Sequence, residues 1–263
     1  MAQTLYQVDS FTPQPFKGNP AGVCLLEGPA PESWMQDIAA EMNLSETSFV
    51  WPEEGAFRLR WFTPTREMYL CGHATLAAAH VMFETGVVAG DGTARFDTLS
   101  GPLSVVRQGG WLEMDFPVWT AEAQPPPAGL AQALGCPVEW FGRNDHFGMA
   151  LLSSPRQVAD LKPDIRLVAA LPMDGVIVTA QGDGNPYDLV CRVFGPNLGI
   201  NEDPVTGGAH CMLTPFWAAR LGRQTLRSYQ ASSRGGELRV TLKGDRVAIA
   251  GQAVTVFKLE VLG

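Results

Sequence analysis

The sequence predicts an α+β fold of two similar domains, each an antiparallel, barrel-like sheet wrapped around a central helix. Two apolar segments of helical length, residues 72–85 and 207–221, each stop before a glycine, Gly86 or Gly222. Short segments with strand character flank both of them. The proline-rich segment Ala123–Gly129 separates the two halves. We therefore expect an N-terminal domain over residues 1–122 and a C-terminal domain over 123–263, with a last strand able to pack on the N-terminal domain.

The N-terminal half contains most of the clear local patterns. Residues 57–62 alternate in polarity and predict a strand, and weaker strand character covers residues 4–9 and 23–26. Apolar residues recur at helical spacing over residues 31–42. Residues 72–85 are alanine-rich and apolar almost all round, which predicts a buried helix. Short strands are expected at residues 95–98, 103–106 and 111–116.

The C-terminal half repeats this arrangement. We expect a short helix over residues 130–134 and the second apolar helix over 207–221. The expected strands cover residues 146–152, 175–179, 188–194, 238–242, 247–250 and 254–261. If the repeat holds, the N-terminal ends of both apolar helices face a cleft between the domains, where we expect the active site.

Composition excludes several classes of protein. With 46% hydrophobic and 17% charged residues, the 263-residue chain has an ordinary globular composition. A net charge of −8 argues against a nucleic-acid surface. The chain has no apolar run of the ~18 residues that a membrane span needs, and its first residues do not resemble a signal peptide. Five scattered cysteines and four histidines without zinc-site spacing favour free thiols, a cytoplasmic protein and no metal.

A polar, glycine-rich segment precedes the second apolar helix. It places Asp203, Thr206, Gly207 and Gly208 before the expected helix start. Helix N-termini bind anions through unpaired N–H groups and the helix dipole. Asp203 could therefore move a proton beside a bound carboxylate. The alternative is purely structural, with Asp203 as the N-cap and Pro204 as the first helical residue.

Two further stretches carry candidate groups. Cys71, Gly72 and His73 stand at the start of the first apolar helix, so this helix end is a second candidate anion site. Glu46 lies between small hydroxyl residues where the chain turns into a strand. The alternative for Glu46 is a capping box in which Asn43 is the N-cap.

Six segments together resemble the phenazine-biosynthesis PhzF-like family, which belongs to the diaminopimelate-epimerase fold group. They are Val8–Thr12 with Phe16–Pro20, Asn43–Thr47, Trp61–Pro64, Leu70–Leu76, Gly199–His210 and Ser233–Gly236. They occur in order over almost the whole chain. The resemblance implies a two-domain fold with a helix inside each barrel, a homodimer, and an isomerase that works without a cofactor on a small anionic substrate.

The resemblance also implies roles for individual residues. Glu46 would be the principal acid/base, with Asp203 and His73 as accompanying polar groups. The expected substrate-binding residues are Asn19, Gly72, Thr206, Gly207 and Gly208. The family usually has a serine where this chain has Gly208, so any substrate contact by that hydroxyl is lost or replaced.

Two other functions stay open from the sequence. A thiol at a helix N-terminus can act as a base, so Cys71 with a carboxylate would fit a racemase or epimerase of the same fold group. The second thiol of such a pair would correspond to Asp203, which makes a buried structural thiol the favoured interpretation of Cys71. A ligand-binding protein without catalysis is the other alternative, although it would gain little from a buried set of ionisable groups.

Overall fold

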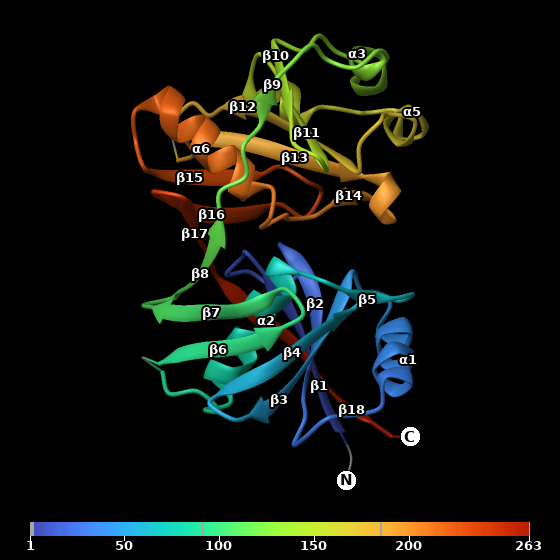
Figure 1. Cartoon of the computed structure of the whole chain (residues 1–263), viewed down its shortest axis with the longest axis vertical. Helices are drawn as coiled ribbons and strands as arrows, with labels where there is room; N and C mark the ends of the chain where they lie inside the picture. The colour runs from blue at the N-terminus through green and yellow to red at the C-terminus, as the bar shows by residue number, and fades with distance from the viewer. Residues whose placement is uncertain (1–2, 91, 185, 263) are drawn as a thin grey trace. The chain divides into compact units, whose positions relative to one another are not determined.

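The computed structural model describes residues 3–90, 92–184 and 186–262, which form a mixed α/β fold that is mostly sheet with few helices (Figure 1). Contacts divide the chain into two compact units. Unit 1 extends to Asp115 and takes in the chain again from Ala250, and unit 2 is Phe116–Ile249. The first boundary thus lies before the one expected after residue 122.

The described residues of unit 1 form nine strands, one of which ends two residues beyond Asp115. They are β1 (Gln3–Ser10), β2 (Asn19–Leu25), β3 (Glu46–Glu53), β4 (Ala56–Phe62), β5 (Glu67–Met68), β6 (Thr93–Thr98), β7 (Gly101–Gln108), β8 (Trp111–Pro117) and β18 (Ala253–Val261). β1 pairs antiparallel with both β18 and β2, and β2 pairs parallel with β3. β4 pairs antiparallel with β3 and β5 and parallel with β6, and antiparallel β7 and β8 follow.

The helix α2 (Gly72–Glu84) forms the centre of unit 1 (Figure 1). It packs against β1, β2, β3 and β18, and ten of its thirteen residues are buried. Its fully buried alanines at positions 74 and 77–79 allow the strands to approach closely. The chain leaves the helix at Gly86, whose φ of +76° is in the left-handed region that glycine tolerates. The helix α1 (Glu32–Met42) buries Met35 and Ala39 against Phe49 and Phe62.

Unit 2 has the same order of parallel and antiparallel pairings. Its strands are β9 (Glu122–Ala123), β10 (Trp140–Arg143), β11 (Phe147–Leu151), β12 (Gly175–Gln181), β13 (Leu189–Gly195), β14 (Ile200–Asp203), β15 (Thr225–Gln230), β16 (Gly236–Lys243) and β17 (Arg246–Gly251), which continues into unit 1. β11 pairs parallel with β12, and β12 antiparallel with β13. β13 pairs antiparallel with β14 and parallel with β15, which pairs antiparallel with β16.

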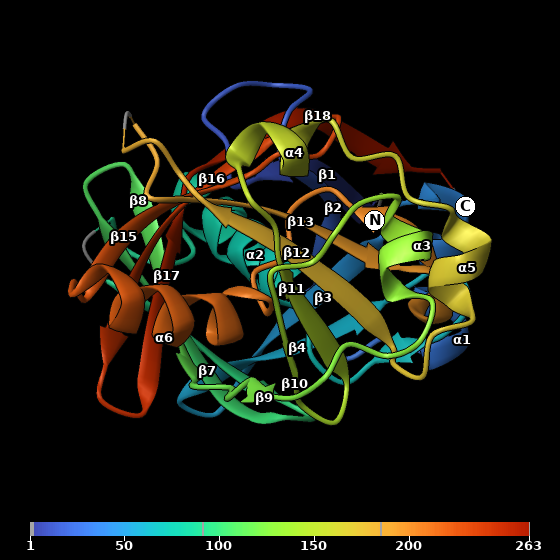
Figure 2. The ribbon, with the colours of Figure 1, turned by 90° about the horizontal axis from the view of Figure 1, so that it is seen from above.

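The described residues of unit 2 also form four α-helices and a short 3₁₀ helix. They are α3 (Leu130–Leu134), α4 (Pro155–Ala159), α5 (Ile165–Ala169), η1 (Pro196–Leu198) and α6 (His210–Leu221). α3 lies beside α5 (Figure 2). Side chains of Ser154 and Asp164 cap α4 and α5 by accepting backbone N–H bonds, which is the usual way to satisfy a helix start.

Each expected strand overlaps an observed strand, and the helices expected over residues 31–42, 72–85 and 130–134 are confirmed as α1, α2 and α3. The start of α6 was predicted wrongly. This helix begins at His210 rather than at Gly207, because residues 200–203 pair with β13 as a strand and residues 204–209 form the connection. Sequence patterns also missed the short elements α4, α5, β5, β10, β14 and β15. In the described part of the chain, no helix is long and apolar enough to cross a membrane.

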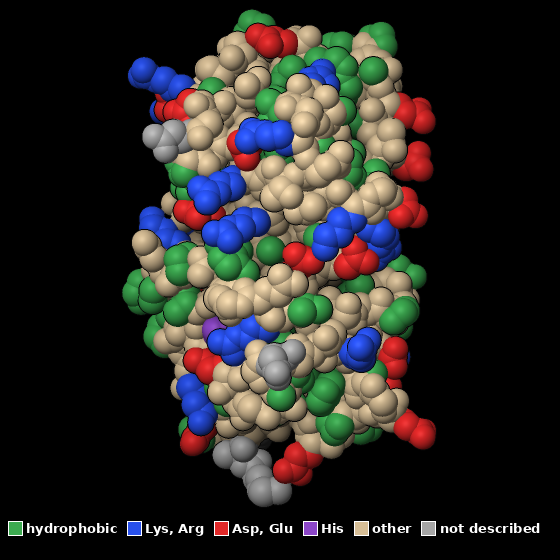
Figure 3. Space-filling model, turned by 90° about the vertical axis from the view of Figure 1, so that its left-hand side faces the viewer, with side chains coloured by type: hydrophobic (Ala, Val, Ile, Leu, Met, Phe, Trp, Pro, Cys, Tyr) green, Lys and Arg blue, Asp and Glu red, His purple; other side chains and the backbone are tan. Residues whose placement is uncertain are grey.

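Charged side chains of both signs lie interspersed on the face shown in Figure 3. Oppositely charged side chains also pair in both units, with Arg223–Asp188 at 2.6 Å and Arg60–Glu32 at 2.7 Å. This arrangement accords with the moderate net charge of −8.

Candidate active site

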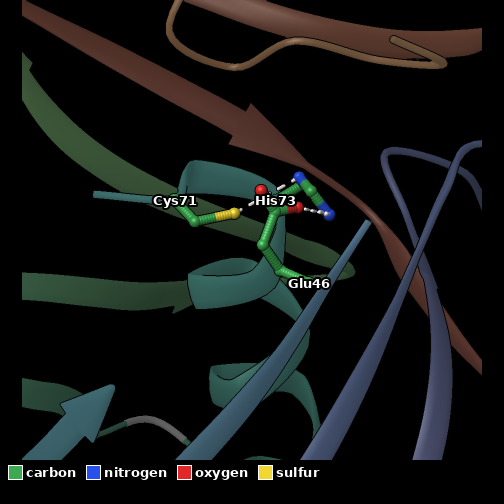
Figure 4. Close-up of side chains that lie close together, drawn as sticks. All are labelled: Glu46, Cys71 and His73. Atoms are coloured by element: carbon green, nitrogen blue, oxygen red, sulfur yellow. Dashed lines mark hydrogen bonds and ion pairs between the residues drawn. The ribbon is translucent and has the colours of Figure 1, made fainter. Parts of the chain in front are cut away.

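Three ionisable side chains of unit 1 meet at the start of α2. His73 Nε2 lies 3.3 Å from Glu46 Oε2, and His73 Nδ1 lies 3.5 Å from Cys71 Sγ (Figure 4). Only 8% of the His73 side chain and 14% of the Glu46 side chain are exposed, and Cys71 is buried. The imidazole therefore lies between a thiol and a carboxylate in a largely dry environment.

The local folding of β3 explains where Glu46 points. Alternate residues of a strand face the same side, so Glu46 shares a face with Ser48. The Ser48 hydroxyl donates to the carbonyl of Ala74 in the first turn of α2 at 2.9 Å. β3 thus presents both side chains to the same helix start. The alternative of a capping box was wrong, because Asn43 ends α1 in the left-handed conformation and Glu46 begins a strand.

Other hydroxyl groups hold the first turn of α2 in place. Ser10 of β1 donates to the carbonyl of His73 at 2.8 Å, and Thr75 donates to the carbonyl of Cys71. Asn19, an expected substrate-binding residue, is fully buried at the start of β2 and pairs with Ser10. Gly72 is the first residue of the helix. Asn19 and Gly72 are thus placed around the same helix start as His73.

Burial determines the charge of His73. It lowers the pKa of the imidazole to about 4, because water no longer solvates the charged form. His73 is therefore neutral near pH 7, with one N–H donor and one lone-pair acceptor on its ring. It contacts Glu46 without the full positive charge that would make the carboxylate a weaker base.

The remaining predicted residues lie in unit 2. Asp203 ends β14, and its Oδ2 accepts a hydrogen bond from the Thr206 hydroxyl at 2.6 Å. Gly207 and Gly208 belong to the turn that leads into α6. The alternative of Asp203 as an N-cap was wrong, because the N-cap of α6 is Ala209.

A buried glutamine organises this connection. Gln230 Nε2 donates to the Asp203 carbonyl at 2.7 Å and to Thr206 Oγ1 at 3.2 Å. Its Oε1 accepts from the Thr206 backbone N–H at 2.9 Å. His210 also binds the connection, since its Nδ1 lies 2.9 Å from the Thr206 carbonyl. The connection that follows Asp203 is thereby held by side chains from β15 and α6.

An ion pair anchors the strand that carries Asp203. Arg192 of β13 contacts both carboxylate oxygens of Glu202, at 2.7 and 2.9 Å. Its third nitrogen donates to three backbone carbonyls, those of Val158, Ala159 and Leu161. Glu202 neighbours Asp203 on β14, so this pair fixes the end of the strand. Sequence reasoning missed Arg192 and Gln230, and a single arginine inside the apolar run 189–194 was the one available signal.

Comparison with known proteins identifies the relatives of this chain. The family described as phenazine biosynthesis-like protein matches residues 8–259. A protein of Halalkalibacterium halodurans named as an uncharacterized isomerase is 43% identical over 263 residues, which cover 100% of this chain and 99% of the relative. The chain belongs to the phenazine biosynthesis-like family. It is an enzyme of the isomerase type, as relatives in this family are named.

Solved structures agree with membership of the PhzF family. A PhzF-family protein of Enterococcus faecalis has a TM-score of 0.96 and 44% identity, with 100% of both chains covered. A hydroxyproline epimerase of Agrobacterium vitis has a TM-score of 0.64 at 14% identity, covering 99% of this chain and 91% of the epimerase. The second likeness shows the fold alone, and it relates the PhzF fold to epimerase-like folds.

The position where the PhzF-like resemblance expects serine is compatible with a side chain. A Cβ atom built on Gly208 would lie 3.4 Å from Trp119, which is an ordinary contact. The backbone there does not adopt the left-handed conformation. Steric crowding therefore does not explain the glycine.

Glu46, Cys71 and His73 are also the one group of three metal-ligating types that the described residues bring together. Their arrangement does not suit a single ion. The sulfur contacts Nδ1 and the carboxylate contacts Nε2, and one ion could replace only one of these contacts. The imidazole is hydrogen-bonded to the thiol and lies at ion-pair distance from the carboxylate.

A pocket of about 290 Å³ lies at the other end of α2. Its lining residues are His80, Phe83, Glu84, Arg107, Gly110, Leu112 and Ala253. His80 is two helical turns from His73, or roughly 10 Å along the axis. This pocket is therefore separate from the candidate active site of the PhzF-family chain.

Proposed function

We propose that this protein is a cofactor-independent isomerase that moves a proton on a small carboxylate-bearing substrate, with Glu46 as the general acid and base. The single observation that carries the proposal is the contact between Glu46 and a neutral, buried His73 at 3.3 Å. A neutral imidazole beside the carboxylate can donate to it or accept from it, so Glu46 has a partner in both of its protonation states. General catalysis of this kind contributes about 10²- to 10⁴-fold in rate.

The proposed reaction needs no outside oxidant or reductant. The Glu46 carboxylate removes a proton from a carbon beside the activating group of the substrate, and the C–H electron pair moves into that group. The protonated Glu46 then returns the proton to another carbon of the anion. The product is an isomer of the substrate, and the enzyme regains its starting state.

Donors near Glu46 support an anionic substrate. The N–H groups of the first turn of α2 point away from the helix body and carry the positive end of its dipole. The N–H groups at Gly72 and His73 would bind a carboxylate and stabilise charge that develops in the transition state.

We also propose roles for the unit 2 residues in the same reaction. Asp203 would act as the second proton-transferring group, with Thr206, Gly207 and Gly208 binding the substrate. Two hydrogen bonds support this role, because Thr206 donates to the Asp203 carboxylate and Gln230 donates to the Asp203 backbone carbonyl. We also propose that the protein forms a homodimer, because the family resemblance implies one. Measuring the molecular mass of the protein in solution would test this.

Hydrogen exchange with solvent tests the reaction directly. We expect the wild type to incorporate deuterium from D₂O into members of a panel of small carboxylic and amino acids. Glu46→Gln should lower incorporation by about 10²- to 10⁴-fold. Glu53→Gln is the matched control, because Glu53 is exposed at the other end of the same strand and should exchange normally.

Two results would contradict the proposal. One is full exchange by a folded Glu46→Gln variant, which would exclude Glu46 as the base. The other is exchange that survives in Glu46→Gln but disappears in both Cys71→Ser and Cys71→Ala. That pattern would favour the racemase or epimerase alternative, whose supporting observation is the buried Cys71 thiol beside the His73 ring.

A further inference from the structure

We infer that Cys71 is a positioning residue for His73: its thiol donates to Nδ1 and thereby directs the Nε2–H of the ring toward Glu46. This inference rests on the proposed function of Glu46 and deepens it. It gives the cysteine a role that differs from direct proton transfer to the substrate.

The two ring nitrogens have partners of different chemistry. A neutral imidazole can donate from one nitrogen only, and the partner of the other nitrogen must then be a donor. An ionised Glu46 carries its negative charge 3.3 Å from Nε2, and this charge favours the tautomer whose proton is on Nε2. The lone pair consequently lies on Nδ1, which faces Cys71 Sγ at 3.5 Å.

The thiol is suited to meet that lone pair because it keeps its proton. Sγ lies within 4.8 Å of a carboxylate oxygen of Glu46. Two negative charges this close in a buried site repel each other, so one of the two groups stays neutral. With Glu46 ionised, Cys71 carries its S–H, and the ring nitrogen beside it is an acceptor.

A thiol also accommodates the later stage of the reaction. Once Glu46 is protonated, its O–H can donate to Nε2 in the other tautomer of the ring, which forms when the Nε2 proton leaves to solvent and a proton from solvent binds Nδ1. Sulfur accepts as well as donates, although weakly in both roles. Cys71 can therefore partner both tautomers, which an alanine at position 71 could not.

The structure indicates that position 71 tolerates small substitutions. Cys71 is the N-cap residue of α2, but its side chain makes no capping hydrogen bond. Its carbonyl accepts from Thr75, and any residue supplies that group. Cys71→Ala and Cys71→Ser should therefore fold, and they differ from each other in the ability to donate to Nδ1.

Nitrogen NMR of the ring tests the inference without any substrate. In protein labelled with ¹⁵N-histidine at pH 7, His73 should show a protonated Nε2 and an unprotonated, hydrogen-bonded Nδ1. Its signals are assigned by their loss in His73→Gln. His210 is the internal control, because its Nδ1 faces a carbonyl at 2.9 Å and must be the protonated nitrogen.

Cys71→Ala and Cys71→Ser should differ in the nitrogen signal of His73 and in the rate of deuterium exchange. In Cys71→Ala the Nδ1 signal should move downfield, toward that of a nitrogen without a donor, and in Cys71→Ser it should stay hydrogen-bonded. Deuterium exchange should fall about three- to tenfold in Cys71→Ala, the loss expected for one neutral hydrogen bond. Cys71→Ser should restore most of it.

Three outcomes would overturn the inference. The first is a protonated Nδ1 in the wild type, and the second is an Nδ1 signal that Cys71→Ala does not change. The third is a fall in deuterium exchange that is as large in Cys71→Ser as in Cys71→Ala. The expected NMR result without exchange on any substrate would instead contradict the proposed function alone, so the two failures are distinguishable.

Discussion

Replacing Arg192 by Met should lower the free energy of unfolding by about 3–5 kcal/mol, the usual cost of removing one partner of a buried ion pair. The side chains of Arg192 and Glu202 are 11% and 23% exposed, so most of the pair is out of water. Both oxygens of Glu202 lose their charged donors at 2.7 and 2.9 Å. Three backbone carbonyls also lose their hydrogen-bond donor, the third nitrogen of Arg192. The shortest of these bonds is the one to Leu161, at 2.7 Å. At roughly 2–4 °C per kcal/mol for a chain of this size, the melting temperature should fall by about 10 °C.

An exposed pair of the same chemistry supplies the control. Arg156 contacts Asp160 at 3.3 Å, and their side chains are 91% and 71% exposed. Exposed pairs at this helical spacing contribute about 0.3–0.5 kcal/mol, so Arg156→Met should change the melting temperature by little. The assay is thermal and urea unfolding of both variants and of Arg192→Met/Glu202→Met, which should recover part of the loss because no charge stays buried alone. Equal, small effects of Arg192→Met and Arg156→Met would refute the reasoning.

Two other predictions concern Gly208 and the buried histidines. Gly208→Ser should fold normally and raise the free energy of unfolding by about 0.4–1 kcal/mol, because serine restricts the unfolded chain and its Cβ meets only Trp119, at 3.4 Å. Urea unfolding measures this gain, and a clear destabilisation would show that the turn needs glycine. Burial lowers the pKa of His73 and of His210 to about 4, against 6.5 for an ordinary histidine. Between these values the unfolded chain binds protons that the folded protein does not, so stability should fall as the pH drops from about 6.5 toward 4. Urea unfolding at pH 7 and pH 5 measures this loss, which should be smaller in His210→Gln, and equal losses would contradict the assignment.

Local patterns predicted much of the secondary structure and the family. The alternation at residues 57–62 became β4, and the alanine-rich segment became α2 with Gly86 at its end. These predictions succeeded because the polarity of each residue reports the side of the element that faces the core. The six family segments work in a similar way, since each keeps a set of residue types at fixed spacing.

Pairing between distant segments decided the rest. The chain turns from β14 into the connection at 204–209 because β13 binds residues 200–203, so α6 starts later than its glycines suggested. The residues Ile200–Asp203 do not by themselves indicate that β13 will pair with them, so this strand could not be predicted locally. Short helices such as α4, whose five residues give no full apolar period, were missed for the same lack of local information.

The sequence by itself determined which residues are candidates, namely Glu46, His73, Cys71 and Asp203. Tertiary structure alone decided that three of them form one chain of contacts. Glu46 and His73 come within 3.3 Å because β3 and the first turn of α2 pack together through Ser48. The neutral state of His73 is likewise a result of packing, because desolvation arises only when the strands of unit 1 close around the helix.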